Sequence, residues 1–306
     1  MQDLNSQFIL NMLIIALGYT GKRTGIVKEK DGEGLARIIF NFTLPALVIN
    51  IISKSKIDYS LIWLPAINIA FGILMALIAL LVFRKETHKR RGMLSMVLPG
   101  LNVALFAFPL VEALWGEEAL KYIAMFDMGS TVVIFGICYL LASCFSFDGS
   151  AVDFKSMAVR VLRSFPFLAL MVTLAVYLAG FHFPGIIIEI SGVLAKANMP
   201  LSLLLLGIYL NFSFESGYLS GMAKVIAIRY LAGIAAGAGL YLVLPFDTLF
   251  RSTILLGFVL PIASSSIPYS VQFGYDRKFI ATLTNITIIA SFVLIWVSSI
   301  VFKTGR

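Results

Sequence analysis

The chain has 306 residues, of which 59% are hydrophobic and 13% charged, and its mean hydropathy is +0.95. Soluble domains average about 45–50% apolar and about 25% charged residues, so this composition excludes a soluble globular protein and predicts an all-α integral membrane protein. The net charge of +8 could suit nucleic acid, but the basic residues lie between apolar runs, which argues against a nucleic-acid partner.

The sequence lacks the common motifs of catalysis and cofactor binding. We find no Walker A pattern, no dinucleotide fingerprint, no H-E-x-x-H and no nucleophile elbow. Cys138 and Cys144 lie in one apolar run without metal-ligand spacing, and His88 and His182 lie in different connections. We therefore expect no enzyme, no cofactor and no metal site.

Ten apolar runs follow one another, each close to the roughly 20 residues that a bilayer span needs. The predicted spans are residues 5–20, 34–53, 60–83, 93–115, 119–145, 160–180, 186–211, 221–244, 252–273 and 279–302. Most Lys and Arg residues lie in the odd-numbered connections, such as "RKETHKRRG". The positive-inside rule then predicts a multi-pass protein of the inner (plasma) membrane with both termini extracytoplasmic.

Ten spans divide into two halves of five, and an odd number of spans per half gives the halves opposite orientations. We therefore predict two inverted five-helix repeats, as in many secondary transporters. The first repeat would be residues 1–145 and the second residues 160–306, joined by a cytoplasmic linker at 146–159.

The proline pattern supports the repeat. The second span contains "NFTLPALVIN" and the seventh "KANMPLSLLLLG", so Pro45 matches Pro200. The fourth span contains "LPGLNVALFAFP" and the ninth "LPIASSSIP". Proline removes a backbone donor and disrupts a helix. Matched breaks in two halves point to a transport site, because freed backbone groups are tolerated at membrane depth only in protein or beside an aqueous cavity.

Candidate substrate-binding residues lie at these prolines. Asn102 can donate its amide to a carboxylate, although an interhelical hydrogen bond is the alternative. Hydroxyl groups in the ninth span could also face the substrate, although each could bond back to its own helix. The full set predicted for the substrate is Asn41, Pro99, Asn102, Pro109, Pro261, Ser264, Ser265, Ser266 and Pro268.

Asp127 is an acid inside the fifth span, and intramembrane acids are usually functional. It could couple transport to protons, it could be paired structurally, with Lys196 as one partner, or it could lie near the membrane surface. Asn285 in the tenth span is its repeat-mate and a second candidate for ion coupling. Gly233 and Gly237 form a GxxxG pair, which predicts close helix packing and would suit a scaffold or a dimer face.

Four stretches together resemble the auxin efflux carrier family, especially its bacterial permeases. They are "LARIIFNFTLPALVIN", "GLNVALFAFPLVEALWGEEAL", "MFDMGS" and "LPIASSSIPYSVQFGYDRKFIATLTNIT". The resemblance implies that the fourth and ninth helices are unwound and cross at mid-membrane. It also implies a small organic carboxylate as substrate, an elevator-like motion between a scaffold and a transport domain, and allows a homodimer.

Two departures from the family pattern leave the substrate and the coupling ion open. Ser264, Ser265 and Ser266 stand where relatives often carry an amide, and Ser130 stands where Asn is common. The ninth span contains no acidic residue, so a sodium site like that of the distantly similar bile-acid symporters has less support. H⁺ is therefore the better supported coupling ion. We predict a secondary-active transporter of dicarboxylates or auxin-like acids. The alternative is a ligand-binding membrane sensor on a transporter fold.

Overall fold

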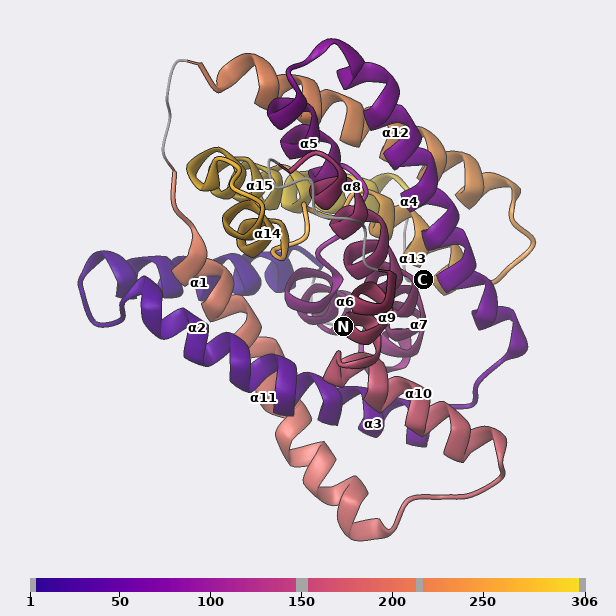
Figure 1. Ribbon diagram of the computed structural model, residues 1–306. Helices are drawn as coiled ribbons and strands as arrows, with labels where there is room; N and C mark the ends of the chain where they lie inside the picture. The colour runs from indigo at the N-terminus through magenta and orange to yellow at the C-terminus, as the bar shows by residue number, and fades with distance from the viewer. Residues whose placement is uncertain (1–3, 147–153, 213–216, 303–306) are drawn as a thin grey trace.

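The computed structural model describes residues 4–146, 154–212 and 217–302, and helices account for its regular structure (Figure 1). Among these residues the β pairing is confined to one isolated antiparallel bridge, between Leu101 and Ile262. The all-α prediction is therefore confirmed. The predicted linker at 146–159 and both chain ends lie partly outside the described residues.

Helical segments lie at each of the ten predicted ranges. In the first half they are α1 (Leu4–Arg23), α2 (Glu29–Ile38), η1 (Ile39–Thr43), α3 (Leu44–Lys54), η2 (Tyr59–Ile62), α4 (Trp63–Val82), η3 (Phe83–Lys85), α5 (His88–Val97), η4 (Val103–Ala107), α6 (Phe108–Trp115), η5 (Glu117–Ala119), α7 (Leu120–Val132), η6 (Val133–Cys138) and α8 (Tyr139–Cys144). In the second half they are α9 (Phe154–Leu162), α10 (Phe165–Leu178), α11 (Gly185–Tyr209), α12 (Leu219–Val243), α13 (Thr248–Phe258), α14 (Ser266–Gln272) and α15 (Arg277–Val301).

Six helical stretches of the described residues are long and apolar enough to cross a membrane by themselves, which fits an integral membrane protein. They are Glu29–Lys54, Tyr59–Lys85, Glu117–Cys144, Gly185–Tyr209, Leu219–Val243 and Arg277–Val301. Three shorter apolar helices, Val103–Trp115, Phe165–Leu178 and Thr248–Phe258, accompany them.

The matched prolines Pro45 and Pro200 do not break their helices, contrary to the expectation. The chain passes from α2 into α3 through the π-helical turn η1, so that Pro45 lies in the first turn of α3. A π turn lets the chain continue where the proline ring would clash with the carbonyl four residues earlier. Pro200 lies inside the continuous helix α11. These two prolines therefore distort or bend a helix without freeing a segment of backbone.

Contacts between the connections show which of them lie at the same end of the helical bundle. Arg277 lies 3.7 Å from Glu29, and Lys224 lies 3.7 Å from Glu86, so odd-numbered connections meet one another. The opposite side is joined by other contacts, such as that from the Tyr122 hydroxyl to Asp247 at 3.1 Å. The basic connections thus gather at one end.

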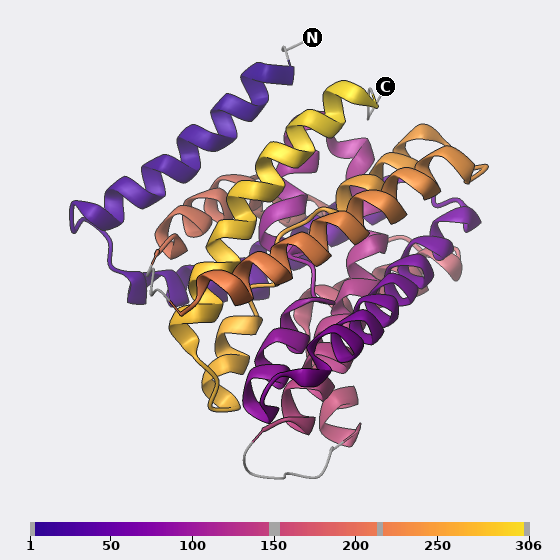
Figure 2. The ribbon, with the colours of Figure 1, turned by 90° about the horizontal axis from the view of Figure 1, so that it is seen from above.

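The outer ends of α1 and α15 lie together, away from the basic connections. The Trp296 indole donates to the Asn5 side chain at 3.1 Å, and Phe8 and Phe292 pack edge to face. Figure 2 shows the start of α1 and the end of α15 on the same side of the molecule.

Glycines allow two pairs of helices to approach closely. A Cβ atom at Gly207 of α11 would lie 2.0 Å from the Ile15 carbonyl oxygen of α1. A Cβ atom at Gly233 of α12 would lie 2.3 Å from the Phe258 carbonyl oxygen of α13. The GxxxG pair therefore packs within the chain, since Gly237 also faces α13 at Leu255. Close packing is as predicted, but this motif faces its own chain and provides no dimer surface.

We expect Asp247→Ala to lower the free energy of unfolding by about 1 kcal/mol, because Asp247 is the N-cap of α13. Its carboxylate accepts from the Phe250 backbone N–H at 2.9 Å, and the alanine variant loses this bond. Asp247→Asn is the matched control, since asparagine caps a helix equally well. Thermal unfolding in detergent checks the prediction, and equal stability of the two variants would refute the capping role.

Candidate substrate site at two interrupted helices

Two helices are interrupted in the middle of the molecule, and prolines explain where. The first interruption spans residues 98–102, between α5 and η4, and includes Pro99. The second spans residues 259–265, between α13 and α14, and includes Pro261. Proline cannot donate to the carbonyl one turn earlier, so each helix ends just before its proline. The second proline of each stretch does not interrupt the chain, because Pro109 and Pro268 lie in the first turns of α6 and α14.

The two interrupted segments pair with each other as a short antiparallel bridge. The Asn102 N–H donates to the Pro261 carbonyl at 2.9 Å, and the Ala263 N–H donates to the Gly100 carbonyl at 3.3 Å. The Asn102 side chain adds a bond from Nδ2 to the Ser264 Oγ at 2.9 Å. Backbone N–H and C=O groups that lose their helical partners at one break thus form hydrogen bonds with those of the other break, in the other half of the chain. We call residues 98–102 and 259–265 the paired breaks.

Most predicted substrate residues lie at the paired breaks, at different depths. Asn102 is 4% exposed and Ser266 is 2% exposed, while Ser264 and Ser265 are half-buried. Pro99, Pro109 and Pro261 are buried, and Pro268 is exposed. The accessible edge of the site is therefore formed by Ser264, Ser265 and Pro268, and the Asn102 amide bonds to Ser264.

Two hydroxyl groups on neighbouring helices form hydrogen bonds to the paired breaks. Ser130 of α7 donates to the Leu101 carbonyl at 3.2 Å. Thr287 of α15 accepts from the Ile262 N–H at 3.1 Å. Because Leu101 and Ile262 form the bridge, each helix steadies one strand of it. Both hydroxyl groups are fully buried, and these bonds hold the two segments of the paired breaks in place.

The structure does not bring the two candidates for ion coupling into one cluster. Asp127 is half-buried on α7 and makes no hydrogen bond or ion pair with the described residues, so its suggested pair with the exposed Lys196 is not formed. Asn285 is buried on α15 and donates its amide to the carbonyl oxygens of Tyr209 at 3.2 Å and Asn211 at 2.6 Å. This amide secures the end of α11.

Asn41 lies apart from the paired breaks. Its amide donates to the Arg37 carbonyl at 2.8 Å, one turn back along the same helical run. The neighbouring Thr43 donates instead to the buried Asn198 of α11 at 3.1 Å. Within the described part of the chain, the Asn41 side chain has no hydrogen bond to the paired breaks.

Sequence reasoning overlooked Arg229, which lies in the middle of α12 and is 1% exposed. Its guanidinium donates to carbonyl oxygens that both breaks set free, at 2.8 to 3.3 Å: Val97, Leu98, Gly100, Leu260 and Pro261. A signal was present, since a lone arginine inside an apolar span is a candidate functional residue by default.

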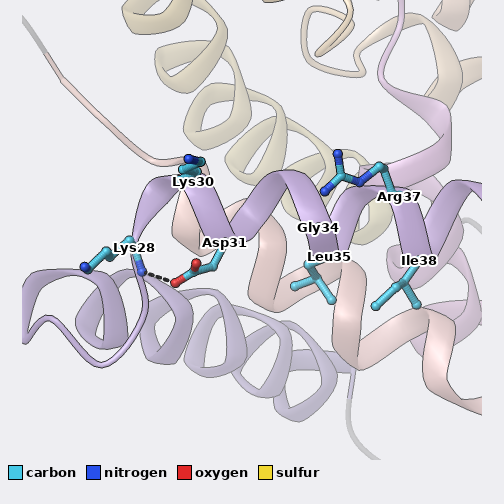
Figure 3. Close-up of a pocket in the computed structure, with 7 residues that line it drawn as sticks. All are labelled: Lys28, Lys30, Asp31, Gly34, Leu35, Arg37 and Ile38. Atoms are coloured by element: carbon cyan, nitrogen blue, oxygen red, sulfur yellow. Dashed lines mark hydrogen bonds between the residues drawn. The ribbon is translucent and has the colours of Figure 1, made fainter.

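A separate, open pocket lies along α2, well apart from the breaks in sequence and lining. Figure 3 shows its lining residues Lys28, Lys30, Asp31, Gly34, Leu35, Arg37 and Ile38, with the Lys28 N–H donating to the Asp31 carboxylate at 2.8 Å. It contains none of the predicted site residues. Among the residues that the structure describes, no group of three His, Cys, Asp or Glu side chains could hold a metal.

Comparison with known proteins links this chain to membrane transport. Residues 8–146 match the family model described as membrane transport protein. The chain is 26% identical over 304 residues to an uncharacterized transporter of Methanothermobacter thermautotrophicus, covering 97% of this chain and 98% of the relative. It is 22% identical over 298 residues to an uncharacterized transporter of Methanocaldococcus jannaschii, covering 94% and 95% of the two chains.

Proposed function

Because the chain belongs to the membrane transport protein family, the family of the auxin efflux carriers, we propose that it is a secondary-active carrier of small organic anions, such as dicarboxylates or auxin-like acids. Family membership makes it a multi-pass membrane transporter and argues against an enzyme. The observation that carries the proposal on the substrate is the pairing of two interrupted helices, one from each half of the chain, at Asn102 and Ser264.

The charge distribution at the paired breaks favours an anion. The helical run from Val103 to Trp115 begins directly after Asn102, and the N-terminus of a helix carries a positive partial charge. The Asn102 amide and the hydroxyl groups of Ser264 and Ser265 can donate hydrogen bonds there. The opposite, negative helix ends are already occupied by Arg229. A carboxylate therefore finds hydrogen-bond donors at the paired breaks, where Arg229 already balances the negative helix ends.

The helix contacts support an architecture of ten spans in two inverted repeats, with the fourth and ninth helices broken and crossing. One group of helices packs mainly on itself: α1, α3, α10 and α11. A second group surrounds the breaks and includes α4 with α7 and α12 with α13. We assign the first group to a scaffold and the second to a transport domain that moves as an elevator, which gives alternating access.

The positive-inside rule assigns the basic end of the bundle to the cytoplasm. The outer ends of α1 and α15 lie at the other end of the bundle, which supports a placement of both termini outside the cytoplasm, in the inner (plasma) membrane. As a secondary carrier, the protein would be driven by an ion gradient, the membrane potential or the substrate gradient.

Reconstitution in liposomes tests the proposed function. Purified protein is incorporated, a proton gradient is imposed, and uptake of labelled malate is followed with protein-free liposomes as the baseline. We expect malate to accumulate above its external concentration. If folded protein moves neither malate nor any of a panel of monocarboxylates, including an indole acid, the carrier proposal fails.

Asp127→Asn should abolish proton-driven accumulation while leaving exchange of labelled for unlabelled malate intact. Asp127 has no described partner, so its carboxylate is free to take up and release a proton, which the amide of asparagine cannot do. Glu118→Gln removes an exposed acid from the connection before α7 and is the matched control. Full accumulation by the Asp127 variant would exclude this residue as the proton carrier.

A further inference from the structure

Arg229 is a buried positive charge in an apolar helix without an acidic partner among the described residues. It lies at mid-length in α12 and is 1% exposed, and its hydrogen bonds go to backbone carbonyl oxygens alone. A charge at this depth is very costly unless it is compensated. The compensation must therefore come from the carbonyl groups themselves.

These carbonyl groups belong to the ends of two helices. Val97 and Leu98 end α5, and Leu260 and Pro261 follow directly on α13. The C-terminus of a helix carries roughly half a negative charge. Two such ends therefore sum to about one negative charge, which one guanidinium balances.

Every nitrogen of the guanidinium is engaged. Nε donates to Leu260 at 3.2 Å, and Nη2 donates to Leu260, Pro261 and Gly100 at 2.9 Å each. Nη1 donates to Leu98 at 2.8 Å and more weakly to Val97 at 3.3 Å. The Arg229 side chain thus bonds to both breaks, and its guanidinium has no remaining N–H donor for a substrate.

A cage of converging backbone carbonyls from unwound helices is also the kind of site that holds a coupling cation in secondary transporters. Hard cations prefer such oxygen ligands. Here the same position already contains a covalently attached cation. We propose that Arg229 is a built-in replacement for a coupling cation at the paired breaks, and that anion transport by this chain therefore requires no Na⁺.

This inference deepens the proposed function and rests on it for the statement about transport. The cage itself is testable without any substrate, through the thermal stability of the purified protein. Ligands that bind only the folded state raise the midpoint of unfolding. A site already filled by Arg229 should give no such response, whereas a site emptied by mutation should respond to small cations.

The experiment compares the wild type with Arg229→Ala and Arg229→Lys in detergent. Midpoints of thermal unfolding are measured in NaCl, in choline chloride at equal ionic strength, and in choline chloride with millimolar methylguanidinium. Arg37→Ala is the matched control, because Arg37 is exposed at the end of α2. Malate uptake into liposomes is measured in parallel with Na⁺ or choline.

We expect the wild type and Arg37→Ala to have the same midpoint in NaCl and choline chloride. Arg229→Ala should unfold about 5–10 °C lower in choline chloride, because two helix ends lose their counter-charge, and methylguanidinium should restore part of this loss. Arg229→Lys keeps the charge but loses the forked geometry of the guanidinium. Its unfolding midpoint should therefore lie between those of the wild type and Arg229→Ala, and Na⁺ should not change it. Wild-type uptake should not depend on Na⁺.

Four results would overturn the inference: uptake by the wild type that requires Na⁺, stabilisation of the wild type by Na⁺, an unchanged midpoint for Arg229→Ala, or a lowered midpoint that neither methylguanidinium nor Na⁺ raises. If Arg229→Ala does not fold, the same comparison is made with Arg229→Lys, where stabilisation by Na⁺ would contradict it. Failure of malate transport alone would reject the proposed substrate and leave the cage result standing.

Discussion

Gly233→Ala should lower the midpoint of thermal unfolding by about 3–10 °C, corresponding to an overpacking cost of about 1–3 kcal/mol. The added methyl group would lie 2.3 Å from the Phe258 carbonyl oxygen, a backbone atom that cannot move aside without shifting α13. Phe258 is the last residue of α13 before the break, and Arg229 reaches the break from one turn away on α12. A shift here therefore disturbs the carbonyl cage and malate uptake together.

Gly239→Ala is the matched control, because Gly239 lies on the same helix and a Cβ atom there meets nothing within 4 Å. Alanine is the better helix former by about 1 kcal/mol, so this variant should be as stable as the wild type or slightly more stable. Equal effects of the two substitutions would show that helix propensity, and not the contact with α13, governs the result.

Asn102→Ala should reduce the initial rate of malate uptake by about 10- to 100-fold, the range expected for losing one hydrogen bond to a charged group. The amide sits at the start of the run from Val103, where it can donate to a carboxylate, and it donates to the Ser264 hydroxyl at 2.9 Å. Stability should fall much less than uptake, since the backbone bonds of the paired breaks remain.

Asn41→Ala is the matched amide control, because within the described residues the Asn41 side chain bonds only to the Arg37 carbonyl of its own helical run. Uptake by this variant should stay within about two-fold of the wild type, as is usual for substitutions outside buried networks. Equal losses in the two variants would mean that a non-specific effect, and not loss of a substrate contact, lowers the rate.

The positions of the interruptions could be predicted from the sequence, because Pro99 and Pro261 act locally through a missing donor and a fixed ring. The same local rule was wrong for Pro45 and Pro200, where a π turn and a continuous helix absorb the proline. The sequence contains no local signal that separates these outcomes, since the accommodation depends on the packing of α11 against α3 and η1.

Long-range pairing could not be predicted from the residues alone. Ser130 and Thr287 each bond to a break, but only the folded chain brings Leu101 opposite Ile262. The positive-inside rule concerns basic residues in the connections, so it gives no role to Arg229. Its position ten residues into an apolar helix gave the signal, while its carbonyl partners became visible only in three dimensions.

Protection of the site by substrate tests the central claim, that the anion binds at the paired breaks, most directly. Ser265→Cys, made in a Cys144→Ser background that removes the exposed native thiol, places a half-buried thiol at the accessible edge of the site. Its rate of labelling by a small maleimide is measured with and without saturating malate. We expect malate to slow the labelling strongly, and Asn102→Ala to remove this protection. Labelling that is equally fast with malate, in protein that transports malate, would contradict the account.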